Sequence, residues 1–239
     1  MGLVRMGPPV DLLLLLRDRF NVKTFVEGGT YQGATASWAG AHFETVYSIE
    51  RSEPYFEIAS SRYKHLTNIS FMLGDTRRLM PIVLTRLRGS AIFWLDSHWC
   101  GAESYGAGDE CPLLDEIDAI NQSKFDHFLL IDDARLFLAP PSRPHVISQW
   151  PTIDQVADAL RRDGISRYII VIDDVIIAVP SHTKDVVAHW CQNAVRPEDK
   201  TESSLRDGYI DVRRIKRKIG RVARQSVAKL AQRRYPHVK

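Results

Sequence analysis

The sequence predicts an α/β fold in which an open, mostly parallel sheet carries helices on both faces. Three observations support this prediction. Apolar runs of strand length alternate with helix-compatible segments along most of the chain. The run Ala91-Ile-Phe-Trp-Leu-Asp96 is almost continuously apolar, which is typical of a central strand that is buried on both faces. Two β-branched runs within residues 168–179 flank Asp173-Asp174, which indicates an antiparallel hairpin at the end of the sheet.

The leucine-rich segment at residues 10–20 favours a helix, because Pro8 and Pro9 provide a natural helix start. We expect this helix to cover one face of the sheet. Its apolar run from Leu12 to Leu16 is too short to span a bilayer.

The later elements follow from the alternation of apolar runs and turn signals. Pro54 suits the first turn of a helix, and Gly164 suits a helix end. The expected strands are residues 23–26, 45–50, 69–73, 91–96 and 125–131, and the expected helices between and after them are residues 33–41, 54–64, 82–88, 112–120 and 152–163.

A glycine turn follows the first of these strands, in Thr24-Phe-Val-Glu-Gly-Gly-Thr-Tyr-Gln-Gly33. Its Glu27-x-Gly29-x-x-x-Gly33 spacing differs from the Gly-x-Gly-x-x-Gly of dinucleotide-binding turns. The pattern resembles motif I of the class I S-adenosylmethionine (SAM)-dependent methyltransferases. With the strands and the hairpin that follow, the resemblance to this family covers roughly residues 20–180. The resemblance implies a Rossmann-like class I methyltransferase fold with a mostly parallel seven-stranded sheet and a C-terminal antiparallel hairpin. It also implies SAM as the cofactor.

Acids at strand ends are the expected cofactor contacts. Glu50 closes the second strand, where a carboxylate can accept hydrogen bonds from both ribose hydroxyls. The alternative is that Glu50 only caps the following helix. Asp75 and Thr76 follow the third strand, where they could read the adenine edge, although turns of this composition are common. The predicted cofactor-binding residues are Glu27, Gly28, Gly29, Thr30, Gly33, Glu50, Asp75, Thr76 and Asp96.

Three further acids could form a metal site. Asp96 follows the fourth strand, and Asp132 and Asp133 follow the fifth. Clustered carboxylates are costly to bury unless a cation neutralises them, and oxygen ligands suit Mg²⁺. The placement resembles the metal-dependent O-methyltransferases, both the catechol type and small bacterial enzymes that methylate sugar hydroxyls on antibiotics. In the alternative, one acid binds the cation or a helix end and the others face water.

His98 is the predicted general base, and Asp96 is assigned to catalysis with it. The catechol enzymes place a base lysine three residues after the first acid, but this chain has Trp99 there. An imidazole titrates near neutral pH and could take the proton of a hydroxyl, although a histidine at a strand end is often structural. The expected acceptor pocket comprises Trp99, Glu103, Tyr105 and Glu110. A zinc site at His98, Cys100 and Cys111 is disfavoured, because no fourth ligand has standard spacing.

The charge distribution divides the chain. The net charge is +3, yet residues 212–239 contain Lys and Arg but no Asp or Glu. We predict an N-terminal helical segment at residues 1–20, a methyltransferase domain at residues 21–190 and a basic tail at residues 191–239. The tail is compatible with an amphipathic helix that contacts an anionic membrane surface or a protein partner. Nucleic acid is a less favoured partner, because aromatic residues are sparse in the tail.

The three cysteines argue for a reducing compartment and against a disulfide framework, so we expect a cytoplasmic protein that could lie at the inner membrane face. The leading hypothesis is metal-assisted O-methylation of a hydroxylated small molecule, sugar or glycan. The alternatives are a metal-independent methyltransferase and a catalytically inactive binding protein docked to a membrane or partner by the tail.

Overall fold

A computed structural model of the chain describes residues 7–99, 106 and 108–194. The basic tail predicted from residue 191 onwards lies almost entirely outside the described residues. The strands are β1 (Thr24–Gly28), β2 (Thr45–Glu50), β3 (Ile69–Leu73), β4 (Ala91–Leu95), β5 (Phe128–Ile131), β6 (Arg167–Ile172) and β7 (Val175–Pro180). The α-helices are α1 (Val10–Phe20), α2 (Ala34–Gly40), α3 (Glu53–Arg62), α4 (Thr76–Arg86), α5 (Leu113–Asn121), α6 (Arg135–Leu138), α7 (Ile153–Leu160) and α8 (Lys184–Ala194).

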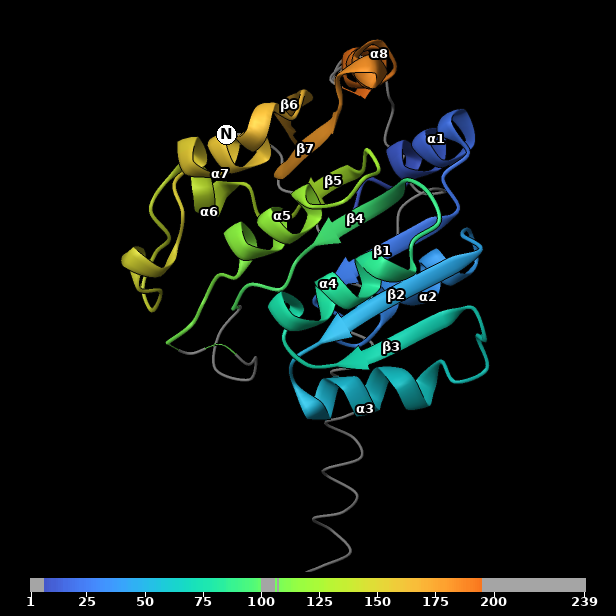
Figure 1. Ribbon diagram of the computed structural model, residues 1–239. Helices are drawn as coiled ribbons and strands as arrows, with labels where there is room; N and C mark the ends of the chain where they lie inside the picture. The colour runs from blue at the N-terminus through green and yellow to red at the C-terminus, as the bar shows by residue number, and fades with distance from the viewer. Residues whose placement is uncertain (1–6, 100–105, 107, 195–239) are drawn as a thin grey trace, which may run out of the picture. The chain divides into compact units, whose positions relative to one another are not determined.

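The strands form one seven-stranded sheet in the order β3-β2-β1-β4-β5-β7-β6 (Figure 1). The first five strands are parallel to one another, and β7 pairs antiparallel with both β5 and β6. The last strand of the chain is therefore inserted beside β5, and the predicted architecture is confirmed.

The strand register brings the carboxyl ends of the parallel strands to one edge, which we call the carboxyl edge. Gly28 of β1 is aligned with Ile49 of β2 and with Leu95 of β4. Leu95 is in turn aligned with Ile131 of β5. The residues that follow these positions therefore meet at the carboxyl edge, as expected for parallel strands.

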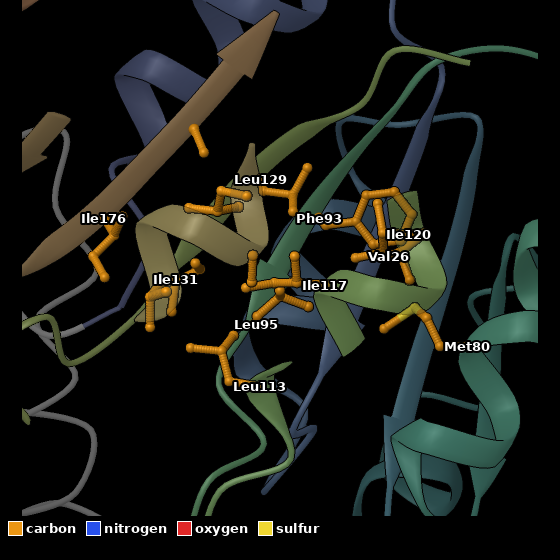
Figure 2. Packing of buried hydrophobic residues seen from close by; sticks show 14 of the residues in the cluster. Val26, Met80, Phe93, Leu95, Leu113, Ile117, Ile120, Leu129, Ile131 and Ile176 are labelled. Carbon is orange, nitrogen blue, oxygen red and sulfur yellow. The ribbon is translucent and has the colours of Figure 1, made fainter. Parts of the chain in front are cut away.

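Two apolar clusters cover the two faces of the sheet. On one face, side chains of β1, β4, β5 and β7 pack against α4, α5 and α7, and Figure 2 shows Phe93, Leu95 and Leu129 facing Ile117 and Met80. The other face is covered in part by α1, whose Leu12, Leu13 and Leu16 are fully buried, and by α2 and α8. The expected role of the N-terminal helix as a cover of the sheet is confirmed. Successive side chains of β4 point to opposite faces of the sheet, and both faces are covered, so every side chain of β4 is buried and apolar.

Several element boundaries differ from the prediction. Helix α4 begins at Thr76 instead of residue 82, because Asp75 caps its first turn and buried Met80 and Val83 hold it against the sheet despite Pro81 within it. Strand β5 begins at Phe128 instead of residue 125.

The late start of β5 has a local cause. The His127 side chain accepts the backbone N–H of Ala91 at 3.0 Å, and the Phe125 N–H donates to the Ser123 hydroxyl. These side chains replace strand pairing at the entry to β5. Helix α7 ends at Leu160 instead of residue 163, because Arg161 already leaves the helical region at a φ of −111° and Asp163 is left-handed at a φ of 58°. Helices α6 and α8 were not predicted.

Within the described part of the chain, every helix is either too short or too polar to cross a membrane.

Candidate functional site

The glycine turn allows two strand ends to approach closely. Gly29 has a φ of +89°, and a Cβ placed on it would lie 2.0 Å from the carbonyl oxygen of Asp96. The Asp96 N–H donates to the Gly28 carbonyl at 2.9 Å. At Gly33, with φ +78°, a Cβ would meet the ring of Tyr63 at 2.9 Å. Glycine is thus required at Gly29 and Gly33 by packing within the protein as well as by the turn itself.

Glu27 lies in a buried polar network below this turn. Its carboxyl accepts the Ser48 hydroxyl at 2.5 Å, and Ser48 is also hydrogen-bonded to the Thr30 hydroxyl at 2.6 Å. Burial raises the pKa of Glu27 to about 8, although hydrogen bonds from Ser48 and Thr35 oppose the shift. The structure therefore makes Glu27 and Thr30 supports of the turn, and their predicted cofactor contact stays a prediction.

We expect Glu27→Gln to flatten the pH dependence of stability. The pKa of Glu27 rises from an ordinary 4.5 to about 8, so the folded protein keeps a proton that the unfolded chain releases between these values. The stabilisation from this proton is complete below the unfolded pKa and is lost as the pH rises towards 8. Glutamine is neutral at every pH, so the variant should gain up to about 5 kcal/mol relative to the wild type on going from low to high pH. Thermal unfolding near pH 4.5 and near pH 8 measures this change, and parallel profiles would contradict it.

Glu50 lies at the carboxyl edge with its carboxylate turned to the glycine turn. One oxygen accepts the N–H of Tyr31 at 2.7 Å, and the other accepts the N–H of Ser52 at 2.7 Å. Burial raises the pKa of Glu50, while these backbone hydrogen bonds favour its charged form. Glu50 therefore shapes both the turn after β1 and the segment before α3, where it accepts the N–H of Ser52, the residue that precedes the helix.

Asp75 belongs to an ionic cluster at the same edge. It caps α4 by accepting the Arg77 N–H at 2.9 Å, and it pairs with the Arg77 guanidinium at 2.6 Å. Hydrogen bonding from Arg77 is the main cause that lowers the pKa of Asp75. Asp109, from the segment before α5, pairs with Arg77 and also with Arg51 at 3.0 Å. Since Asp75 is engaged by arginine, its predicted reading of the adenine edge stays a prediction.

Thr76 is buried beside the glycine turn. Its methyl group would lie 3.3 Å from a Cβ at Gly28. Next to it is Glu116, whose pKa is raised by complete burial in spite of hydrogen bonds from Ser97 and Thr76. This buried acid on α5 is close to the turn and was not among the predicted site residues.

His98 is the residue on which the acids of β4 and β5 converge. Its Nε2 lies 2.9 Å from Oδ2 of Asp133 and 3.8 Å from Oδ1 of Asp96. The ring is buried, with 5% of its side chain exposed, and it contacts the Trp150 ring edge to face at a centroid distance of 5.4 Å. The predicted base and two of the three predicted acids are thus brought together.

Asp132 and Asp133 have different environments. Burial, followed by the adjacent charge of Asp133, raises the pKa of Asp132 to about 7. Burial also acts on Asp133, but His98 and Arg135 outweigh it and hold the pKa of Asp133 below its ordinary value. The Arg135 Nη1 donates to Oδ1 of Asp133 at 2.6 Å. Asp133 is therefore the ionised member of the pair.

The predicted metal ligands Asp96, Asp132 and Asp133 do not fit a divalent ion as they are arranged. Among the described residues, no three His, Cys, Asp or Glu side chains are grouped so that they could hold an ion. Each oxygen of Asp133 already has one cationic or imidazole partner, His98 or Arg135, which leaves fewer lone pairs for an ion. A metal requirement therefore stays a prediction, and we assign no step to a metal.

Glu110 was predicted to line an acceptor pocket, but the structure buries it. Its carboxylate accepts Trp150 Nε1 at 2.6 Å, the Val146 N–H at 3.0 Å and His145 Nδ1 at 3.0 Å. Although burial acts to raise the pKa of Glu110, these hydrogen bonds hold it below the ordinary value. Glu110 therefore fixes the aromatic wall beside His98.

Trp99 belongs to the same region. Its ring meets His145 edge to face at 5.3 Å, and its buried Nε1 has no hydrogen-bond partner among the residues that the structure describes. The other predicted pocket residues, Glu103 and Tyr105, lie outside the described residues, as does Cys100 of the disfavoured zinc reading. Cys111 is described, and burial raises the pKa of its thiol to about 11.

Comparisons with known proteins agree with this architecture. No family model matches the sequence, and no curated protein sequence matches it. Among solved structures, the chain is similar to an O-methyltransferase from Bacillus cereus in complex with S-adenosylhomocysteine (SAH), with TM-score 0.52, 13% identity, and coverage of 72% of this chain and 82% of that one. It is equally similar, with TM-score 0.52 and 16% identity, to a candidate caffeoyl-CoA O-methyltransferase from Staphylococcus aureus, over 74% of this chain and 86% of that one. The chain has the class I SAM-dependent methyltransferase fold.

Proposed function

We propose that the protein is a SAM-dependent methyltransferase that methylates a hydroxyl group of a small molecule or sugar. The observation that carries the proposal is the meeting of a donor-binding turn and an acid-supported histidine at one edge of the sheet. The Gly28-Gly29 turn and Glu50 lie at the ends of β1 and β2, and His98 with Asp133 follows β4 and β5. The names of the similar solved structures, an O-methyltransferase and a candidate caffeoyl-CoA O-methyltransferase, support the same reaction class.

The proposed donor, SAM, supplies a methyl group activated by its sulfonium. Glu50 is placed to hold the ribose, because its carboxylate has about four acceptor positions and the N–H groups of Tyr31 and Ser52 use two of them. Gly28 and Gly29 keep side-chain atoms away from the turn. These residues bind and align the donor, which is the main contribution that a transfer of this kind needs.

His98 would remove the proton of the acceptor hydroxyl. The ionised carboxylate of Asp133 accepts a hydrogen bond from Nε2 in the tautomer that we assign to His98, so the lone pair lies on Nδ1. Nδ1 is then the atom that takes the proton, and Asp133 stabilises the imidazolium that forms. Asp96, at 3.8 Å from Nε2, adds a second negative charge in favour of that cation.

We expect Glu50→Ala to weaken SAH binding about tenfold to hundredfold, the usual worth of hydrogen bonds to a charged group. The rise in melting temperature caused by SAH measures the effect. Glu57→Ala, an exposed glutamate on the neighbouring helix α3, is the matched control. Since Glu50 also accepts the N–H groups of Tyr31 and Ser52, both variants must first show cooperative unfolding. An unchanged SAH-induced shift in a folded Glu50→Ala protein would remove the ribose role.

A metal-assisted form of the reaction is a second candidate, favoured by the presence of Asp96, Asp132 and Asp133 at the carboxyl edge. The arrangement around His98 leads us to expect methyl transfer that survives EDTA. Loss of activity in EDTA, with recovery on addition of Mg²⁺, would instead support the metal-assisted form.

A further inference from the structure

We propose that Arg135 and Asp174 are positioning residues that hold Asp133 against His98, and so couple the β6–β7 hairpin turn to the site. The inference rests on the proposed function, in which His98 is the base. The contacts that link Arg135 and Asp174 to His98 run through one residue. Both act through the carboxylate of Asp133.

The contacts form a continuous chain. The Nη1 group of Arg135 lies between two carboxylates, since it donates to Oδ1 of Asp133 at 2.6 Å and is also paired with Asp174. The other oxygen of Asp133 is 2.9 Å from His98 Nε2. One carboxylate thus connects the guanidinium to the imidazole, and Arg135 fixes its orientation.

Asp174 makes three contacts with Ala134 and Arg135 at the start of α6. Its Oδ1 accepts the backbone N–H of Arg135 at 2.8 Å, and its carbonyl accepts the N–H of Ala134 at 2.8 Å. Its carboxylate also pairs with the Arg135 guanidinium. The Asp174 side chain is only 5% exposed, whereas the Arg135 side chain is 44% exposed, so only the Asp174 end of the ion pair is shielded from solvent. The hairpin turn is therefore attached to the segment after β5 at both backbone and side chain.

The fold explains why a hairpin turn reaches this position. Strand β7 pairs antiparallel with β5, so the chain enters β7 beside the carboxyl end of β5. The two turn residues Asp173 and Asp174 have positive φ values of 49° and 70°, as a two-residue hairpin turn requires, and aspartate tolerates this conformation. The turn thus presents Asp174 where Arg135 begins α6.

Asp133 needs such support. It has a left-handed φ of 57°, which is unfavourable for a residue other than glycine, and the carboxyl group of Asp132 is its neighbour. Without Arg135, Oδ1 of Asp133 would lose its cationic partner, and the carboxylate could then rotate away from His98. The Arg135 side chain is 44% exposed, so its ion pairs should contribute little to overall stability. Its loss should therefore change the site more than the fold.

The experiment compares Arg135→Gln, Arg135→Lys and Asp174→Asn with the wild type. Arg162→Gln is the matched control, because Arg162 forms a similarly exposed ion pair with Asp118 on the surface. The first measurement is the ring 15N spectrum of the histidines, in which His98 is identified by its loss in His98→Gln. The second is turnover at saturating SAM together with the KM for SAM, measured with whichever acceptor supports SAH release.

In Arg135→Gln and Asp174→Asn, we expect the His98 ring signals to move and turnover to fall about tenfold or more, as misplacement of a catalytic group does. The KM for SAM and the melting temperature should stay near those of Arg162→Gln, and Arg135→Lys should restore part of the turnover. Unchanged His98 signals in folded Arg135→Gln and Asp174→Asn would overturn the positioning role. If the wild type binds no SAM, the proposed function fails, and the spectra still decide whether the hairpin turn positions His98.

Discussion

Replacement of His98 by glutamine should lower turnover about hundredfold or more, because a positioned general base typically contributes a factor of this size. Glutamine keeps a hydrogen-bonding group near Asp133 but cannot accept a proton at neutral pH. The His98 side chain is buried and lies 2.9 Å from Asp133, so the imidazole is fixed before any acceptor binds. SAH affinity should be unchanged, since Glu50 and the glycine turn are intact in this variant.

The comparison requires a second histidine variant. His189 is exposed on α8, where its Nδ1 is hydrogen-bonded to the backbone carbonyl of Asp185, so His189→Gln controls for the loss of an imidazole. Steady-state SAH release from both variants gives the result. If folded His98→Gln turns over at the rate of His189→Gln, His98 is not the base.

Gly29→Ala should be strongly destabilising. The new Cβ would lie 2.0 Å from the Asp96 carbonyl oxygen, and alanine would have to adopt a φ of +89°. Backbone strain and steric overlap together should cost roughly 3 kcal/mol or more. For a domain of this size, that corresponds to a fall in melting temperature of about 10 °C.

Gly89 supplies the control, since a Cβ there would meet no atom within 4 Å and its φ is not in the left-handed region. Thermal unfolding of Gly29→Ala and Gly89→Ala separates the close approach of β1 and β4 from the general effect of replacing a glycine. Equal melting temperatures would show that the turn does not require glycine at Gly29. If a stable Gly29→Ala protein binds SAH, cofactor binding does not require glycine at Gly29 either.

The sequence predicts the carboxyl edge well because parallel strands fix it. Once β1, β2, β4 and β5 are placed in a parallel sheet, the residues after them must share an edge, and Glu50, Asp96 and Asp132 follow directly. The fully apolar β4 and the Asp173-Asp174 turn likewise have local patterns that identify them. These features depend on residues that are close together in the chain.

Partners that depend on distant contacts could not be predicted in the same way. Asp75 was expected to read adenine, and the structure pairs it with Arg77 and Arg51. Asp109 pairs with the same two arginines, and nothing near Asp109 in the sequence indicates that pairing. Trp150 lies forty residues after Glu110, yet it donates to the Glu110 carboxylate.

Arg135 is the exception that a closer reading could have found. It follows Asp132-Asp133 by two residues, and an arginine beside paired acids is a natural counter-ion. Its second partner, Asp174, becomes evident only when β7 is placed beside β5. The acids were therefore predictable from the strand ends, whereas the cations that neutralise them required the structure.

The central claim is that the carboxyl edge of the sheet binds a methyl donor. Titration calorimetry of the wild-type protein with SAH, SAM and NAD tests it most directly. We expect SAH and SAM each to bind at one site per chain, with no heat from NAD, because the glycine turn lacks the dinucleotide spacing. Absence of binding to both SAH and SAM, or equal binding of NAD, would contradict the claim.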